Sequence, residues 1–127
     1  MSTIFSKIIS EEIKGYKIYE DEFICAFLDV NPMQRGHTLV VPKVEVEDVF
    51  DLDEETYLNL MTAVRDISKM LKNKLNSKKV GVIVDGYLVP HAHVHLIPTN
   101  GPHEIGENLQ KPVTEEELLE VQKLLIS

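Results

Sequence analysis

Three of the five histidines in this chain lie at two-residue spacing in one short stretch, as His91, His93 and His95. Successive side chains of an extended strand point to opposite faces of its sheet, so the three imidazoles share one face. At the usual strand rise they stand roughly 6.5–7 Å apart. The residues between them, Ala92 and Val94, are apolar and predict that the second face packs into a core.

A helix is a poor alternative for this stretch, because positions i, i+2 and i+4 do not form a helical stripe. Pro90 and Pro98 flank the histidines. Since proline cannot donate to a sheet ladder, the pair predicts a short strand bounded by these residues.

Imidazoles on one face serve two kinds of chemistry. Histidine titrates near neutral pH and acts as a nucleophile, acid or base. It also binds zinc and copper, although a flat strand separates the first and third residues by about 13 Å, so a three-histidine metal site requires a strong twist or outside ligands. The alternative is three unrelated histidines on a solvated face. Three in register, in a chain with only two others, favour a site.

The stretch PHAHVHLIP, residues 90–98, resembles the signature of the histidine triad superfamily of nucleotide-binding hydrolases and transferases. The resemblance covers roughly residues 3–98 in the same order and spacing. It includes TIFSKII (3–9), IYEDE (18–22), AFLDV (26–30) and GHTLVVPK (36–43). What it implies is an enzyme that acts on nucleotides.

The resemblance implies two-step nucleotidyl transfer without a cofactor. His93 is the nucleophile that attacks the phosphorus of a nucleoside 5′-phosphoramidate or a related nucleoside monophosphate conjugate, and water then releases the nucleotide. His91 orients the nucleophile and stabilises charge, while His95 lies beside the phosphoryl oxygens and the leaving group. His37, which opens the expected strand 37–42, supports the triad. No metal is required, because imidazolium and backbone N–H groups can hold the developing charge.

The resemblance also implies nucleotide contacts. By itself Asp29, an acidic residue at the end of an apolar strand, is typical of a turn. It matches the family's ribose-binding aspartate, and Val30 matches a base-contacting neighbour. The resemblance implies a purine base, adenine in the family's usual substrates. Further residues are expected around this base or the phosphate: Phe27, Ile8, Ile13, Asp85, Gly86, Leu88 and Val89.

One departure from the family concerns zinc. Many members bind zinc through two cysteines near the amino terminus, a histidine after a proline, and the first triad histidine. Here Thr3, Ser6 and Glu45 occupy the matching positions of the first three ligands. Two hydroxyls and a carboxylate are poor zinc ligands compared with thiolates and imidazole, so we expect no structural zinc.

A second departure is the short connection between Asp85 and His91. Much of the family has a longer glycine-rich loop here, with a Gln or Ser that contacts phosphate. Backbone N–H groups around 86–89 could still cradle a phosphate. The physiological substrate and the turnover rate therefore stay open, and a slow nucleotide-binding or regulatory protein is the main alternative to an enzyme. A three-histidine metal-binding protein is the other alternative.

Apolar periodicity predicts short strands interspersed with one long helix, without regular βαβ alternation. This pattern indicates an α+β domain with a mostly antiparallel sheet. The resemblance sharpens the expectation to the histidine triad fold, with about five strands, a long central helix, short terminal helices and homodimer formation. The expected helices are 3–12, 53–75 and 114–125, and the expected strands are 17–20, 22–28, 37–42, a buried strand 80–84, and 90–98.

Length and composition fit a single globular domain over residues 1–127. The net charge of −8 argues against broad nucleic-acid binding. No apolar run approaches the ~20 residues of a membrane-spanning helix, so we expect no membrane partner. Residues 1–3 show no signal peptide, and Cys25 is the only cysteine, which excludes an intrachain disulfide. We therefore expect a cytoplasmic protein.

Overall fold

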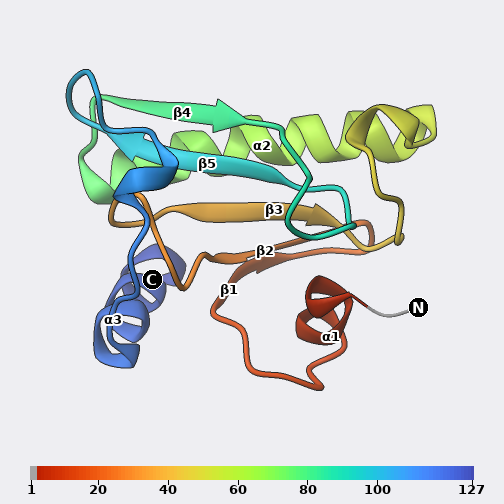
Figure 1. Ribbon diagram of the computed structural model, residues 1–127, viewed down its shortest axis with the longest axis horizontal. Helices are drawn as coiled ribbons and strands as arrows, with labels where there is room; N and C mark the ends of the chain where they lie inside the picture. The colour runs from red at the N-terminus through yellow and green to blue at the C-terminus, as the bar shows by residue number, and fades with distance from the viewer. Residues whose placement is uncertain (1–2) are drawn as a thin grey trace.

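The computed structural model describes residues 3–127, which form an α+β domain with a five-stranded sheet (Figure 1). Met1 and Ser2, which begin the stretch expected to lack a signal peptide, lie outside the described residues. No helix within 3–127 is both long and apolar enough to cross a membrane. The elements are α1 Ile4–Ile9, β1 Lys17–Glu20, β2 Ile24–Leu28, β3 Thr38–Pro42, α2 Glu54–Leu75, β4 Lys79–Ile83, β5 Val94–Thr99, α3 Glu115–Ile126, and the 3-10 turns Val49–Asp51 and Glu107–Leu109.

The strand order is β1-β2-β3-β5-β4, and every neighbouring pair is antiparallel. Strand β2 is central in the sheet, because it has a partner on each side, and all five of its residues are buried. The expectation of a buried strand at 80–84 is wrong. Strand β4 forms an edge of the sheet, and Val82 is 50% exposed despite the β-branched composition that suggested burial.

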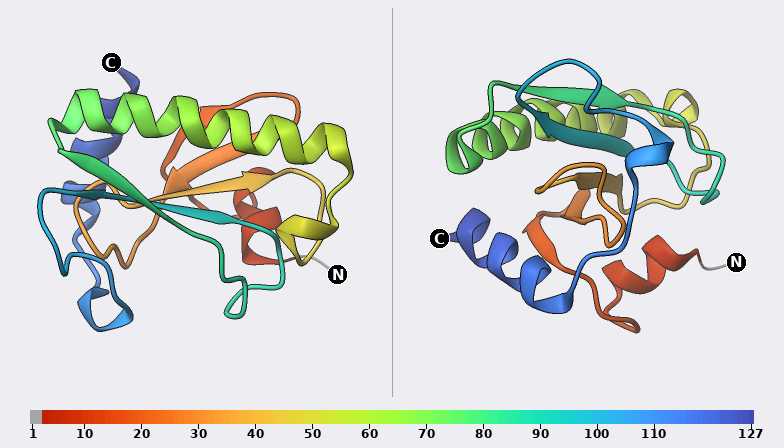
Figure 2. Two further views of the ribbon diagram at one scale, coloured as in Figure 1. Left: turned by 90° about the horizontal axis from the view of Figure 1, so that it is seen from above. Right: turned by 60° about the vertical axis from the view of Figure 1, so that its left-hand side comes forward.

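Helices cover the two faces of the sheet unequally (Figure 2). Helix α2 lies across one face, and α3 packs beside α2 and against β1. Helix α1 covers part of the opposite face (Figure 1). The larger core, on the α2 face, includes Ile24, Leu60, Leu71, Val94 and Leu96, and the smaller one, on the α1 face, consists of Phe5, Ile8, Cys25, Phe27, Leu39 and Val41.

The long and the final helix begin where the sequence indicates. Asp53 is the N-cap residue of α2, and Asn76 ends that helix in the left-handed conformation. Thr114 is the N-cap residue of α3, where its hydroxyl accepts a hydrogen bond from the Glu117 N–H at 3.2 Å. The opening helix is shorter than expected: α1 ends at Ile9, because the chain turns away through Glu11 at a φ of 67°.

The triad strand also has different limits from those expected. It begins at Val94, because the Ala92 N–H donates to the Val46 carbonyl, outside the sheet. It continues through Pro98 to Thr99. Pro98 is compatible with the strand because β3 pairs with β5 only as far as Leu96, so no donor is required from Pro98 on that side.

Candidate active site

Strand register places His95 in a row of side chains on the α1 face of the sheet. His95 lies opposite Leu39 of β3 on one side and Ile83 of β4 on the other. His93 directly precedes β5, and the ring centroids of His93 and His95 are 4.9 Å apart. The alternation is as predicted, since Ala92 belongs to the opposite, α2-side core.

His91 is fully buried, and both of its ring nitrogens have partners. Nε2 lies 2.8 Å from the Pro42 carbonyl oxygen, which can only accept, so Nε2 carries a proton and donates it. Nδ1 lies 2.9 Å from the Thr3 hydroxyl. Neither nitrogen of His91 is therefore available to contact a substrate directly, in contrast to the charge-stabilising role that the resemblance implies.

His93 is held by its own neighbour in the chain. Its Nδ1 donates to the His91 carbonyl oxygen at 2.6 Å, which leaves the lone pair of the neutral ring on Nε2. Phe5 packs edge-on against the ring at a centroid distance of 4.9 Å. Burial lowers the pKa of His93, although its hydrogen bond to the carbonyl acts in the opposite direction. A neutral imidazole with Nε2 unprotonated is the form required of a nucleophile.

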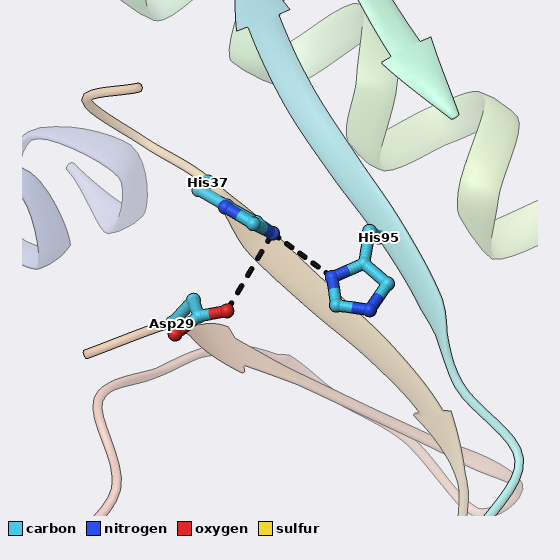
Figure 3. A group of neighbouring side chains, drawn as sticks. All are labelled: Asp29, His37 and His95. Atoms are coloured by element: carbon cyan, nitrogen blue, oxygen red, sulfur yellow. Dashed lines mark hydrogen bonds and ion pairs between the residues drawn. The ribbon is translucent and has the colours of Figure 1, made fainter. Parts of the chain in front are cut away.

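His37 and His95 form a second hydrogen-bonded pair (Figure 3). The Met33 N–H donates to His37 Nδ1 at 3.0 Å, so the neutral His37 ring carries its proton on Nε2. That nitrogen donates to His95 Nδ1 at 3.0 Å. The neutral His95 ring consequently carries its proton on Nε2, as a donor.

Burial keeps both rings of this pair neutral. It lowers the pKa of His37 to about 3, with a further lowering by His95, and it lowers the pKa of His95 to about 4, with a further lowering by His93. Asp29 Oδ2 lies 3.6 Å from His37 Nε2 (Figure 3), and because His37 is neutral this contact is not an ion pair. Burial raises the pKa of Asp29, whose Oδ1 accepts the Asn31 N–H at 2.8 Å.

The backbone before β3 explains how His37 reaches this position. Gly36 has a φ of +90°, and a Cβ there would collide with Leu75 at the end of α2. A glycine is therefore required for the chain to turn closely past α2 and enter β3 with His37 buried. The Asp29 N–H donates to the His37 carbonyl at 2.9 Å, which ties the end of β2 to the start of β3.

Asp29, His37 and His95 are also candidate ligands for a metal ion. The potential ligand atoms of Asp29, His37 and His95 lie within 4.8 Å of one another. However, a metal would need the lone pair of His37 Nε2, and the Met33 N–H fixes a proton on that nitrogen. The three triad histidines do not converge either, since His91 directs its nitrogens toward Pro42 and Thr3. The arrangement suits proton and phosphoryl chemistry better than metal binding.

A pocket of about 340 Å³ opens beside His93 and His95. Of the residues expected to contact the nucleotide, five line it: Asp29, Asp85, Gly86, Leu88 and Val89. The other four lie outside its lining. Phe27 and Ile8 are buried in the smaller core, while Val30 and Ile13 are exposed. A larger hollow of about 510 Å³ lies behind Asp29, between the β2–β3 connection and α3.

Several residues that line this pocket were not predicted from the sequence. Ile4 and Phe5 form one wall. Together with Ile8 and Ile9 they make an apolar stripe at helical spacing near the amino terminus, which is a signal that could have identified them. Leu39 and Ile83 line the pocket because they are the cross-strand neighbours of His95, which only the register reveals. No sequence pattern marked the remaining lining residues: Met33, Tyr87, Gly106, Glu107 and Gln110.

Comparison with known proteins identifies the family of this chain. The sequence model of the HIT domain matches residues 10–101, more than half of the chain. The chain belongs to the histidine triad (HIT) family. A HIT-like protein of Borreliella burgdorferi is 40% identical over 103 residues, covering 75% of this chain and 73% of that protein. The adenosine 5′-monophosphoramidase of Schizosaccharomyces pombe is 30% identical over 121 residues, covering 93% of this chain and 91% of that enzyme.

The HIT fold is confirmed by solved structures. A HIT-like protein of Bartonella henselae superposes with a TM-score of 0.90 at 32% sequence identity, covering 98% of this chain and 94% of that one. The five-stranded antiparallel sheet with its long α2 is thus the HIT fold anticipated from the histidine signature.

Proposed function

We propose that this HIT protein is a nucleotide hydrolase that cleaves nucleoside 5′-phosphoramidates through a nucleotidyl group carried on His93. The observation that carries the proposal is the hydrogen bond from His93 Nδ1 to the His91 carbonyl, which leaves a lone pair on Nε2 of a residue that lines a 340 Å³ pocket. The name of the S. pombe relative, an adenosine 5′-monophosphoramidase, supports the reaction class.

The reaction divides into two displacements at phosphorus. His93 Nε2 forms a bond to the α-phosphorus while the bond to the amine nitrogen breaks, and the amine leaves with the electron pair and takes up one proton. Water then forms the new P–O bond, the bond to His93 breaks, and His93 recovers its lone pair. Nucleoside monophosphate and one proton are released, so the sum is hydrolysis of one P–N bond.

The other histidines have supporting roles. His95 Nε2–H, whose tautomer His37 fixes, donates a hydrogen bond where negative charge develops on the phosphoryl oxygens or the leaving nitrogen. His91 acts through its carbonyl oxygen, which holds the His93 ring. None of these steps requires a metal ion, and we propose that the reaction is metal-independent.

The remaining pocket walls suggest how a nucleoside is held. Asp29 Oδ2 is not engaged in a hydrogen bond within residues 3–127 and can accept a ribose hydroxyl. Ile4, Phe5 and Leu39 provide an apolar wall suited to a purine base such as adenine. Asp29 was the one expected ribose contact, whereas the base contacts that we propose come mainly from residues of α1 not anticipated in the sequence.

Charge in the pocket bears on the leaving group. Asp29, Asp85 and Glu107 line it, whereas its lining includes no Lys or Arg. Carboxylates disfavour a leaving group that carries further phosphates and favour a neutral or cationic amine. This supports a phosphoramidate over a dinucleotide polyphosphate as the substrate.

The test is release of AMP from adenosine 5′-phosphoramidate, in the presence of a chelator, by the wild-type protein and by His93→Ala. We expect turnover by wild type and a loss of at least about 10³-fold in the variant, because the covalent route is removed. His103→Ala, which alters an exposed loop histidine, is the matched control. AMP binding without hydrolysis would favour a nucleotide-binding protein, and activity dependent on added zinc would favour a metal site.

We also propose that the protein forms a homodimer through the edge strand β4. The unpaired edge and the exposed Val82 and Val84 support this, since an apolar edge strand is commonly covered by a partner. Light scattering after size exclusion tests it. Wild type should have twice the monomer mass, and Val82→Lys should shift the equilibrium to the monomer; a monomeric wild type at high concentration would exclude the dimer.

A further inference from the structure

A hydrogen-bonded cluster lies next to Nδ1 of His91, where three separate segments of the chain meet. The Thr3 hydroxyl is 2.9 Å from His91 Nδ1. The Thr3 N–H and the Ser6 hydroxyl both donate to one carboxylate oxygen of Glu45, at 2.8 and 2.6 Å. These contacts lower the pKa of Glu45 and keep it ionised. The cluster thus joins α1 and the segment after β3 to the triad.

The direction of each hydrogen bond follows from its neighbours. The Ser6 hydroxyl gives its one hydrogen to Glu45, so it has none left for His91, 3.5 Å away. The Thr3 hydroxyl accepts the Ser6 N–H at 3.1 Å, as the N-cap residue of α1. Its own hydrogen has two acceptors within reach, the Ser6 hydroxyl at 3.2 Å and His91 Nδ1 at 2.9 Å. The shorter contact is to His91 Nδ1, which is the acceptor nitrogen of the neutral ring because Nε2 donates to Pro42.

His91 connects this cluster to the nucleophile. Its ring is held at both nitrogens, and its backbone carbonyl accepts the hydrogen bond from His93 Nδ1. Phe5, two residues after Thr3, packs against the rings of both His91 and His93. The two ring contacts anchor His91, so loss of one of them allows the residue to shift together with its carbonyl and with the Phe5 ring that packs beside it.

We infer that Thr3 is a positioning residue for the triad, whose hydroxyl fixes the tautomer and orientation of His91 and through the His91 carbonyl keeps His93 Nε2 aimed at the substrate. This inference rests on the proposed function. It assigns α1 a second role besides that of a pocket wall, because the residue that begins the helix also sets the chemistry of a histidine 88 positions along the chain.

The test compares Thr3→Val, which keeps the shape of the side chain and removes the hydroxyl, with Thr3→Ser, which restores it. Thr3→Val should lower kcat for the phosphoramidate about tenfold with KM little changed, because a hydrogen bond at the triad is lost and the nucleoside contacts remain. Thr3→Ser should recover most of the rate. Thr114→Val is the matched control, since Thr114 caps α3 in the same way with no contact to the triad.

A second measurement reads the tautomer directly and needs no turnover. Long-range ¹H–¹⁵N spectra of the histidine rings should show His91 at neutral pH with Nε2 protonated and Nδ1 bare in wild type and Thr114→Val, and a mixture or altered Nδ1 shift in Thr3→Val. Unchanged kcat and unchanged His91 shifts in Thr3→Val would overturn the inference, as would an imidazolium or a protonated Nδ1 in wild type. An inactive wild type with the expected tautomer would instead contradict the proposed function alone.

Discussion

The two faces of the sheet are held by different kinds of interaction. On the α2 face, Leu60, Leu71 and Leu96 are fully buried among apolar neighbours. On the α1 face, the histidines lie beside a smaller apolar cluster, and each ring forms a hydrogen bond. The stabilising free energy of apolar burial is proportional to the buried area and changes little with small displacements. A hydrogen bond to a histidine, by contrast, fixes which ring nitrogen carries the proton. Stability and activity should therefore respond to different substitutions.

The largest expected effect is on the α2 face. Leu60→Ala should lower the free energy of unfolding by about 2–5 kcal/mol, because a fully buried leucine leaves a cavity in the core. Chemical denaturation measures this loss. At a temperature where the variant stays folded, kcat should remain within about twofold of wild type, since the site is remote. A large fall in kcat of the folded variant would show that the two faces are not separable.

The next effect concerns the His37–His95 pair. His37→Ala should lower kcat by about 10–100-fold, because His95 Nδ1 and the Met33 N–H lose their partner and the His95 tautomer is no longer fixed. His37→Gln, which retains an amide donor toward His95, should recover part of the rate. The comparison of both with His103→Ala, on an exposed loop, separates this role from a general effect of removing histidine.

Lowering the pH should reduce the free energy of unfolding through the buried histidines of the α1 face. The pKa values of His37 and His95 are lower in the folded protein than the usual 6.5, so the unfolded chain binds protons first as the pH falls. Their contribution to stability is complete above about pH 6.5 and decreases toward pH 4, by at most about 1.4 kcal/mol per pH unit for each ring. Asp29 acts in the opposite direction. Burial raises its pKa, so the folded protein takes up this proton before the unfolded chain does as the pH falls, which offsets part of the loss of stability.

Urea unfolding at several values between pH 5 and 7 measures this dependence. Within that range the dependence should be flatter in His37→Gln, because one of the buried rings with a lowered pKa is removed while His93 and His95 remain. Wild-type stability that is constant over the interval would contradict the buried, neutral pair.

The smallest expected effect concerns a residue of the α1 face that lines the pocket but does not belong to the core. Ile4 lines the pocket but is 52% exposed. Ile4→Ala should change the free energy of unfolding by no more than about 0.5 kcal/mol. It should raise KM about two- to fivefold through lost apolar contact with the base. Leu119→Ala, on the exposed side of α3, provides the control and should leave both quantities near wild type.

The same contrast explains what could be predicted from the sequence. Period-two spacing gave His91, His93 and His95 a common face, and the 3.6-residue stripe gave α2 almost to the residue, because both are repeating patterns. The edge position of β4 was missed because the composition of Val80–Val84 does not reveal which strands are its neighbours. Register alone places Leu39 and Ile83 beside His95, and the partners that fix each tautomer, such as the Met33 N–H, are backbone groups that no side-chain pattern marks.

The most direct test of the account is to detect the nucleotide on His93. Acid-free rapid quenching during turnover of an adenosine 5′-phosphoramidate, followed by intact-mass measurement and peptide mapping, should show one adenylyl group per chain on the peptide that contains His93. The adduct should be absent from His93→Ala and should accumulate before steady state. Chelator-resistant hydrolysis with no adduct at the shortest times, or an adduct located on another residue, would contradict His93 as the nucleophile.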